Sequence, residues 1–134
     1  MVRGEFVTIG SDVKLKGTLT LPEQANNASS VPVVLMLHGS GPVDRDENYK
    51  WMKMNVFKEL TEYIVPHGFA TLRYDKRGVG ESEGDYFKAG FWDLVKDAEA
   101  SVRFLKTNAQ IDADRIFLLG HSEGCTIAAA LNRR

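Results

Sequence analysis

The chain has 134 residues, of which 43% are hydrophobic and 26% charged, and its 17 basic and 18 acidic side chains give a formal net charge of −1. This length suits a single domain over residues 1–134, and the composition is that of a globular protein rather than a disordered or fibrous one. Because no basic stripe could neutralise a run of phosphates and no apolar run approaches the roughly 20 residues of a membrane helix, we expect a soluble protein with neither nucleic-acid nor membrane partners.

The first segments predict a β-hairpin. Residues 5–9 are rich in strand-forming side chains, and apolar and polar residues alternate over residues 13–21 with the period of a half-buried strand. Between them, Gly10-Ser11-Asp12 has the chemistry of a turn. We therefore expect two antiparallel strands with one exposed face.

A buried strand and a helix are predicted after a polar loop. The strand, at residues 31–37, is almost continuously apolar, which is typical of strands covered on both faces of a parallel sheet. Residues 48–65 then place apolar side chains at helical spacing, and Pro66-His67-Gly68 ends the helix. The expected buried stripe of this helix is Met54, Phe57, Leu60 and Ile64.

The rest of the chain repeats this alternation. The expected elements are a strand at 69–74, a glycine-rich loop at 75–90, a helix at 91–107, a buried strand at 115–119 and a helix at 123–132. A β-hairpin followed by β-α-β-α-β-α predicts the α/β class with a mostly parallel sheet. No linker divides the chain into two domains.

One motif carries a specific chemistry. Gly120-His121-Ser122-Glu123-Gly124 fits G-x-S-x-G, and it lies between a predicted buried strand and a predicted helix. In this context the motif forms a nucleophile elbow, in which the elbow glycines Gly120 and Gly124 leave room for a strained serine to project its hydroxyl. The helix N-terminus stabilises developing negative charge. The alternative is a serine that only caps the helix.

Two further motifs precede the elbow, Leu37-His38-Gly39-Ser40-Gly41-Pro42 and Tyr74-Asp75-Lys76-Arg77-Gly78-Val79-Gly80-Glu81-Ser82. Together with the elbow, they resemble the oxyanion loop, the loop after the fourth strand and the nucleophile turn of the α/β-hydrolase superfamily. The chain is most similar to the N-terminal half of the dienelactone hydrolase and prolyl-oligopeptidase-like esterases. The resemblance runs from about residue 5 to residue 132, and it implies the N-terminal half of an α/β-hydrolase fold.

The resemblance implies a serine hydrolase of the carboxylesterase kind, which works through an acyl-enzyme. By position, Ser122 would be the catalytic nucleophile and the backbone N–H of Glu123 one oxyanion donor. The second donor would be the N–H of Ser40, or that of Gly41 if the loop is set one residue later. Substrates would be small-molecule esters, thioesters or peptides, and neither a metal nor an organic cofactor is implied.

The chain departs from the family after the elbow. The acid and the histidine of the triad follow the serine in family order, yet residues 125–134 contain no Asp, Glu or His. A serine hydroxyl without a base is a weak nucleophile, so we expect the chain alone to be inactive or nearly so, and to be part of a longer protein.

The same departure affects the sheet. In the family the strand before the elbow lies mid-sheet, so here its outer edge would be open, long and apolar. We expect the chain to form a dimer or other homo-oligomer, or to need a missing C-terminal half. The alternative function is a non-catalytic half-domain that assembles through this edge. A nucleotide-binding domain fits poorly, because the third glycine of G-x-G-x-x-G would fall at Asp44 and no P-loop lysine follows.

Most of the remaining side chains are expected to have structural roles. The single cysteine, Cys125, excludes an intramolecular disulfide, fits a cytoplasmic location and is expected to be a small core residue. His67 and the charged residues 44–47 are expected to be solvated, and the Glu123 carboxylate either contacts substrate or caps the helix. Arg77 has the alternative of facing an acidic substrate group. The expected loop supports are His38, His121, Asp75, Arg77 and Glu81.

Overall fold

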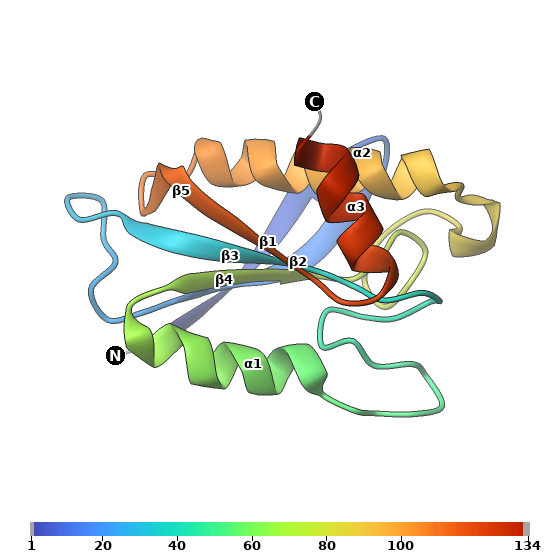
Figure 1. Cartoon of the computed structure of the whole chain (residues 1–134), viewed down its shortest axis with the longest axis horizontal. Helices are drawn as coiled ribbons and strands as arrows, with labels where there is room; N and C mark the ends of the chain where they lie inside the picture. Colours follow the sequence, from blue (N-terminus) through green and yellow to red (C-terminus); the bar gives the residue numbers. More distant parts are fainter. Residues whose placement is uncertain (1, 133–134) are drawn as a thin grey trace.

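The computed structural model describes residues 2–132, which form one five-stranded sheet between layers of helices. The strands are β1 (Arg3–Gly10), β2 (Lys14–Leu21), β3 (Val31–Leu37), β4 (Ala70–Tyr74) and β5 (Ile111–Gly120). The helices are α1 (Val56–Ile64), α2 (Phe91–Lys106) and α3 (Glu123–Asn132), with short 3-10 turns η1 (Val65–His67) and η2 (Tyr86–Lys88). One face of the sheet is covered by α1 and the other by α2 and α3 (Figure 1).

The strand order is β1-β2-β4-β3-β5, and it confirms the predicted architecture. β1 and β2 form an antiparallel hairpin, in which Arg3 lies opposite Leu21 and Gly10 opposite Lys14. β2 is antiparallel to β4, whereas β3 is parallel to both β4 and β5. A hairpin followed by β-α-β-α-β-α in an α/β fold is therefore confirmed. The loops that follow β3, β4 and β5 meet at the end of the sheet where these parallel strands finish, on the right-hand side of Figure 1.

The core explains why the sequence of β3 is continuously apolar. Val33 and Leu35 of β3 and Leu72 of β4 are fully buried, as are Leu15 and Leu19 of β2. β3 has a strand on each side and helices over both faces, so most of its positions are buried and the others, Pro32 and Val34, are partly buried. β2 keeps the alternating pattern because one of its faces is less covered.

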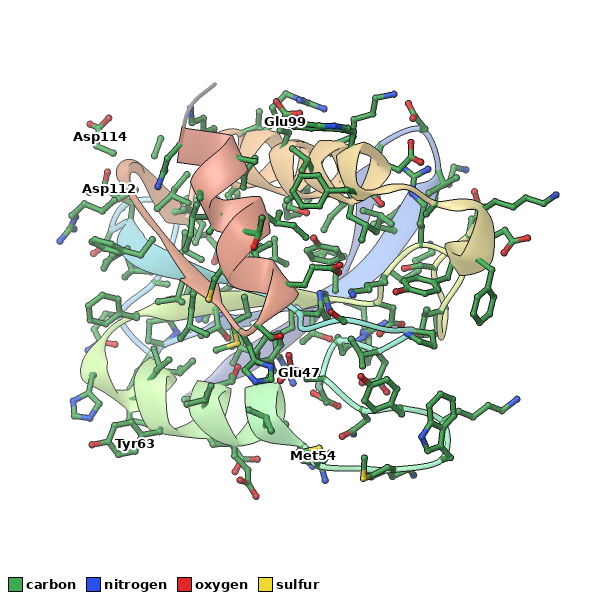
Figure 2. All side chains as sticks on the ribbon, turned by 45° about the vertical axis from the view of Figure 1, so that its right-hand side comes forward. Glu47, Met54, Tyr63, Glu99, Asp112 and Asp114 are labelled. Carbon is green, nitrogen blue, oxygen red and sulfur yellow. The ribbon has the colours of Figure 1, made fainter. Side chains whose placement is uncertain are left out.

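Helix α1 begins later than the sequence predicts. Residues 48–55 form a loop, because the Asn48 side-chain oxygen accepts hydrogen bonds from the N–H groups of Met54 and Asn55, each at 2.6 Å, and Asn55 has a left-handed backbone with φ 53°. The helix starts only at Val56. Met54 lies exposed at the surface (Figure 2), so its place in the buried stripe is wrong, whereas Phe57 is fully buried as predicted.

Strand β5 lies at the edge of the sheet, as expected. It begins at Ile111, earlier than predicted, and pairs with β3 along one side only; no other strand within residues 2–132 pairs with it. Phe117 on this strand is half exposed. Within the same residues, no helix combines the length and apolar character needed to cross a bilayer.

Candidate active site

Ser122 occupies a strained turn between β5 and α3. It has a φ of 55°, in the left-handed region that costs a residue with a Cβ roughly 1–2 kcal/mol. The turn needs its glycines: a Cβ on Gly120 would lie 2.5 Å from the backbone of Gly124, and one on Gly124 would overlap the carbonyl of Leu37. The Ser122 residue is exposed, so the backbone has the geometry that the elbow motif predicts.

The loop after β3 is held against the turn by Lys76. Its ammonium group donates hydrogen bonds to the carbonyl oxygens of Gly39, at 2.6 Å, and Gly41, at 3.0 Å. The carbonyl and N–H of a trans peptide point in opposite directions, and no cis peptide occurs in the described residues. The N–H of Ser40 therefore points away from Lys76, and it has no hydrogen-bond partner within residues 2–132.

The next peptide of this loop is held between two tyrosines. The Tyr49 hydroxyl donates to the carbonyl oxygen of Ser40 at 2.5 Å, and the N–H of Gly41 donates to the Tyr86 hydroxyl at 3.0 Å. Both polar groups of the Ser40–Gly41 peptide are thus engaged. Of the two predicted alternatives for the second donor, Gly41 already has an acceptor and Ser40 does not.

Lys76 also connects this loop to the elbow. Its side chain is 3% exposed, and Nζ lies 3.5 Å from a carboxylate oxygen of Glu123. Burial lowers the pKa of Lys76 below its ordinary value, and the nearby charges of Glu123 and Glu47 partly offset that effect. The Glu123 carboxylate therefore faces Lys76, a partner that sequence reasoning missed. The only hint was the place of this lysine in a glycine-rich loop after a strand.

Glu47 forms a second connection. Its carboxylate oxygen Oε2 accepts from the Gly39 N–H and lies 2.7 Å from Nδ1 of His121. Figure 2 shows Glu47 inside the molecule, near the beginning of α3, and the residue is 5% exposed. His121 therefore supports the loop, as predicted. The expectation of a solvated segment at 44–47 is wrong for Glu47. Its Oε2 has the Gly39 N–H and His121 as partners, whereas its Oε1 is buried without a hydrogen-bond partner in residues 2–132.

The expectation of a solvated segment at 44–47 is also wrong for Arg45. Its guanidinium is mostly buried and binds both carboxylate oxygens of Asp75, and it also pairs with Glu81 at 2.7 Å. Burial alone would raise the pKa of Asp75, but hydrogen bonds from Arg45 and from the Glu81 N–H bring it below its ordinary value. Asp75 and Glu81 tie the loops together as predicted. Arg77 also acts as a loop support, and it joins its loop to α2 by binding Asp97, at 2.7 and 2.8 Å.

No histidine contacts the serine. His38 is buried, and its Nε2 donates to the Tyr74 carbonyl oxygen at 2.5 Å, which confirms it as a support. Burial lowers the pKa of His38 to about 3, so its ring is neutral at pH 7. His67 is exposed in η1, as predicted. Within residues 2–132 no hydrogen bond joins Ser122 to any histidine.

Cys125 was expected in the core, and this prediction is wrong. The residue is exposed, with its sulfur 3.0 Å from the Gly120 carbonyl oxygen. The buried side chain of α3 is Ile127. Since each residue turns a helix by about 100°, Cys125 lies about 200° from Ile127 around α3 and is not on the side that Ile127 buries.

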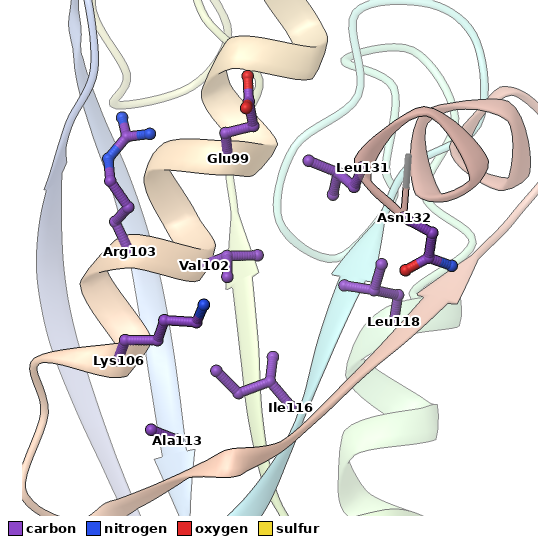
Figure 3. Close-up of a pocket in the computed structure, with 9 residues that line it drawn as sticks. All are labelled: Glu99, Val102, Arg103, Lys106, Ala113, Ile116, Leu118, Leu131 and Asn132. Carbon is purple, nitrogen blue, oxygen red and sulfur yellow. The ribbon is translucent and has the colours of Figure 1, made fainter. Parts of the chain in front are cut away.

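Two cavities are relevant to ligand binding. A groove of about 560 Å³ lies between the loops after β3 and β4, beside the Ser40–Gly41 peptide. A second cavity, of about 370 Å³, lies between α2, β5 and the end of α3, where Val102, Ile116 and Leu131 line it (Figure 3). Ser122 lines neither cavity. In the described residues, no group of three or more His, Cys, Asp or Glu side chains is arranged to hold a metal.

Known proteins resemble this chain in sequence and in fold. Esterase EstD of Thermotoga maritima is 31% identical over 120 residues, which cover 90% of this chain and 27% of EstD. Est1E of Butyrivibrio proteoclasticus, solved with ferulic acid, superposes with a TM-score of 0.73 and 25% identity, covering 95% of this chain and 48% of Est1E. The Pyrococcus furiosus esterase Pf2001 superposes with a TM-score of 0.69 and 25% identity. The match covers 96% of this chain and 46% of the Pf2001 chain.

The chain therefore spans about a quarter of EstD and just under half of each of the two solved structures. The predicted resemblance to part of an α/β-hydrolase domain is confirmed. A family model described as serine aminopeptidase, S33, matches residues 50–134, which is more than half of the chain. The chain belongs to this serine aminopeptidase S33 family of the α/β-hydrolase superfamily.

Proposed function

We propose that this chain carries the nucleophile and the oxyanion donors of a serine hydrolase that cleaves esters through an acyl-enzyme. Ser122 Oγ attacks the ester carbonyl, and the carbonyl oxygen becomes an oxyanion that needs fixed hydrogen-bond donors about 3 Å away. The observation that carries this proposal is the left-handed turn at Ser122, directly before the N-terminus of α3. Such strain is found where a side chain must be presented in one orientation.

The two donors are the N–H groups of Ser40 and Glu123. Glu123 is the first residue of α3, so its N–H has no carbonyl partner inside the helix. The Ser40 N–H is favoured over that of Gly41, because the latter donates to Tyr86. Lys76 holds the carbonyl side of the loop and leaves the donor side of the Gly39–Ser40 peptide for substrate.

The proton of Ser122 needs an acceptor that the described histidines do not provide. His38 and His121 are engaged with Tyr74 and Glu47, and residues 125–134 contain no acid or histidine. The chain by itself should therefore react slowly, by a factor on the order of 10⁴ relative to a complete triad. EstD and Pf2001 are esterases, which favours esters over thioesters and peptides as small-molecule substrates.

A fluorophosphonate probe tests this proposal without requiring turnover. Added imidazole can serve as a soluble base, so labelling of the intact chain should accelerate as the imidazole concentration rises. Mass spectrometry should locate the phosphonate on Ser122. Ser122→Ala should abolish labelling, whereas Ser40→Ala, which keeps the backbone N–H, should retain it. Labelling that is absent at all imidazole concentrations would refute the proposal.

Assembly through β5 is a second candidate function. The outer edge of β5 pairs with no strand of residues 2–132, and the strand carries the half-exposed Phe117. An open strand with apolar side chains readily pairs with another chain. We infer a homodimer or a complex with a C-terminal partner segment.

Light scattering during size-exclusion chromatography tests the assembly. Phe117→Glu should weaken an assembly at β5. The matched control is Phe6→Glu, which changes an exposed aromatic on β1 at the opposite edge of the sheet. A stable monomer at every concentration, or equal effects of the two variants, would contradict assembly through β5.

A further inference from the structure

The groove between the loops after β3 and β4 has the size of a small-molecule site. Its volume of about 560 Å³ lies within the 300–1,000 Å³ that is usual for ligand pockets. Its lining includes Pro42, Lys50 and Trp51 from the first loop and Gly78, Gly80 and Phe87 from the second. These are the loops that hold the Ser40–Gly41 peptide, so the groove adjoins the proposed oxyanion site.

Two aromatic side chains of this groove are unusually exposed. Trp51 is 72% exposed and Phe87 is 85% exposed, although each could bury a large apolar area. Neither ring is loosely placed. Trp51 stacks on Tyr49 with ring centroids 5.0 Å apart, and Phe87 packs edge-on against Tyr86 at 5.4 Å.

These two tyrosines connect the groove to the reaction site. The Tyr49 hydroxyl binds the Ser40 carbonyl, and the Tyr86 hydroxyl accepts from the Gly41 N–H. Each exposed ring is therefore packed on a tyrosine that fixes one side of the same peptide. A ring bound between Trp51 and Phe87 would lie one tyrosine side chain away from the oxyanion loop.

The polar groups of the groove favour a ring that carries oxygen. Lys50 has no ion-pair partner in residues 2–132, so its ammonium group is available to a hydroxyl or methoxy oxygen. Asp44 is less available, because one of its oxygens already accepts from the N–H groups of Asp46 and Asn48.

We propose that this groove binds the aromatic part of an ester of an aromatic acid, with the ring between Trp51 and Phe87 and the ester carbonyl at the oxyanion loop. This inference rests on the proposed hydrolase function and specifies its substrate class. Aromatic rings gain about 0.5–1.5 kcal/mol from stacking beyond area burial, which is a factor of about 2 to 12 in affinity.

Binding to the intact chain tests the inference without turnover. The chain has two tryptophans, so 5-fluorotryptophan labelling should give two ¹⁹F resonances, assigned with Trp51→Leu and Trp92→Leu. Titration with methyl ferulate should shift the Trp51 resonance saturably and leave that of Trp92, on α2, in place. Methyl 3-cyclohexylpropanoate, which has neither the aromatic ring nor the ring oxygens, should bind at least about 3- to 10-fold more weakly.

Two variants provide independent checks. Trp51→Leu and Phe87→Leu should each weaken methyl ferulate about 3- to 10-fold, and Trp92→Leu should not. Both side chains are largely exposed, so neither change opens a core cavity. An unshifted Trp51 resonance, equal affinity for the two esters or unaffected variants would overturn the inference. Binding without labelling of Ser122 would refute only the hydrolase, and labelling without groove binding would refute only the aromatic-acid ester as substrate.

Discussion

The two halves of the proposed site are built in different ways. The loop after β3, residues 38–55, is held by side chains from elsewhere: Lys76, Tyr86 and Asp75 bind its backbone or its arginine. The elbow, residues 120–124, is held mainly by close backbone packing, because its glycines approach the end of β3 and each other. The loop needs particular side chains to be present, whereas the elbow needs side chains to be absent.

This difference predicts opposite sensitivities. Removing a polar side chain should loosen the loop and leave the elbow in place. Adding a methyl group should disrupt the elbow and leave the loop's hydrogen bonds intact. The variants below test that contrast.

The largest expected effect is at Gly124. A Cβ there would overlap the Leu37 carbonyl oxygen, so Gly124→Ala must displace backbone and should lower the free energy of unfolding by about 3 kcal/mol. Gly10→Ala is the control, because no atom lies within 4 Å of its added Cβ. Urea denaturation measures both. Similar midpoints for the two variants would show that the elbow tolerates a side chain.

The next effect concerns pH and His38. Burial, followed by the nearby charge of Lys76, lowers its pKa from 6.5 to about 3. Between these values the unfolded chain binds a proton that the folded chain does not, so stability falls as the pH is lowered, by about 1.4 kcal/mol per unit at most. About 1.6 kcal/mol should be lost between pH 6.5 and 5, because the slope reaches its full value only below pH 6.5.

Denaturant unfolding across this pH range checks the His38 prediction. His38→Gln should flatten the dependence above pH 5, whereas His67→Gln, at an exposed position, should leave it unchanged. A wild-type stability that does not change between pH 6.5 and 5 would mean that His38 ionises normally in the folded state.

A smaller effect is expected at Lys76. Lys76→Met leaves the carbonyls of Gly39 and Gly41 without their donor and should cost about 1–2 kcal/mol. A loosened loop should also slow imidazole-assisted labelling of Ser122 by about 10- to 100-fold. Lys88→Met, at an exposed site in η2, is the control. Unchanged labelling would mean that Lys76 contributes stability but does not orient the donor.

The smallest effect is at Ser122 itself. Ser122→Gly removes the left-handed strain and should raise the free energy of unfolding by about 1 kcal/mol. Thr126→Gly, at an exposed position in α3, should lower it by a similar amount, since glycine weakens a helix interior. If both variants lowered the free energy of unfolding, the turn at Ser122 would not be strained.

Local patterns predicted most of the fold. The alternation in β2, the apolar run of β3 and the helical stripe of α2 each follow from the period of one element. The prediction failed at residues 48–55, where Met54 continues a helical spacing. Asn48 competes there for the backbone N–H groups, which propensity and spacing do not register.

The candidate site was likewise predictable only in part. The elbow was predictable because the spacing of Gly120, Ser122 and Gly124 is itself the steric requirement. The side chains that hold the loop were not, because Tyr86 and Lys76 reach it from distant positions and Glu47 folds back onto it from within, and a polar residue in a glycine-rich segment usually points to water. Arg45 and Glu47 were misjudged for this reason, as was Cys125, whose exposure depends on which side of α3 meets the sheet.

By itself the sequence determined the order of the elements, the α/β class and the sharp turn at Ser122, since these depend on residues close together in the chain. Only the tertiary structure decided which peptide N–H stays unoccupied beside that turn, and that two aromatic rings line a groove next to it. Hydrogen bonds between loops depend on which residues come close together in the folded chain. The spacing of residues along the sequence does not show which ones these are.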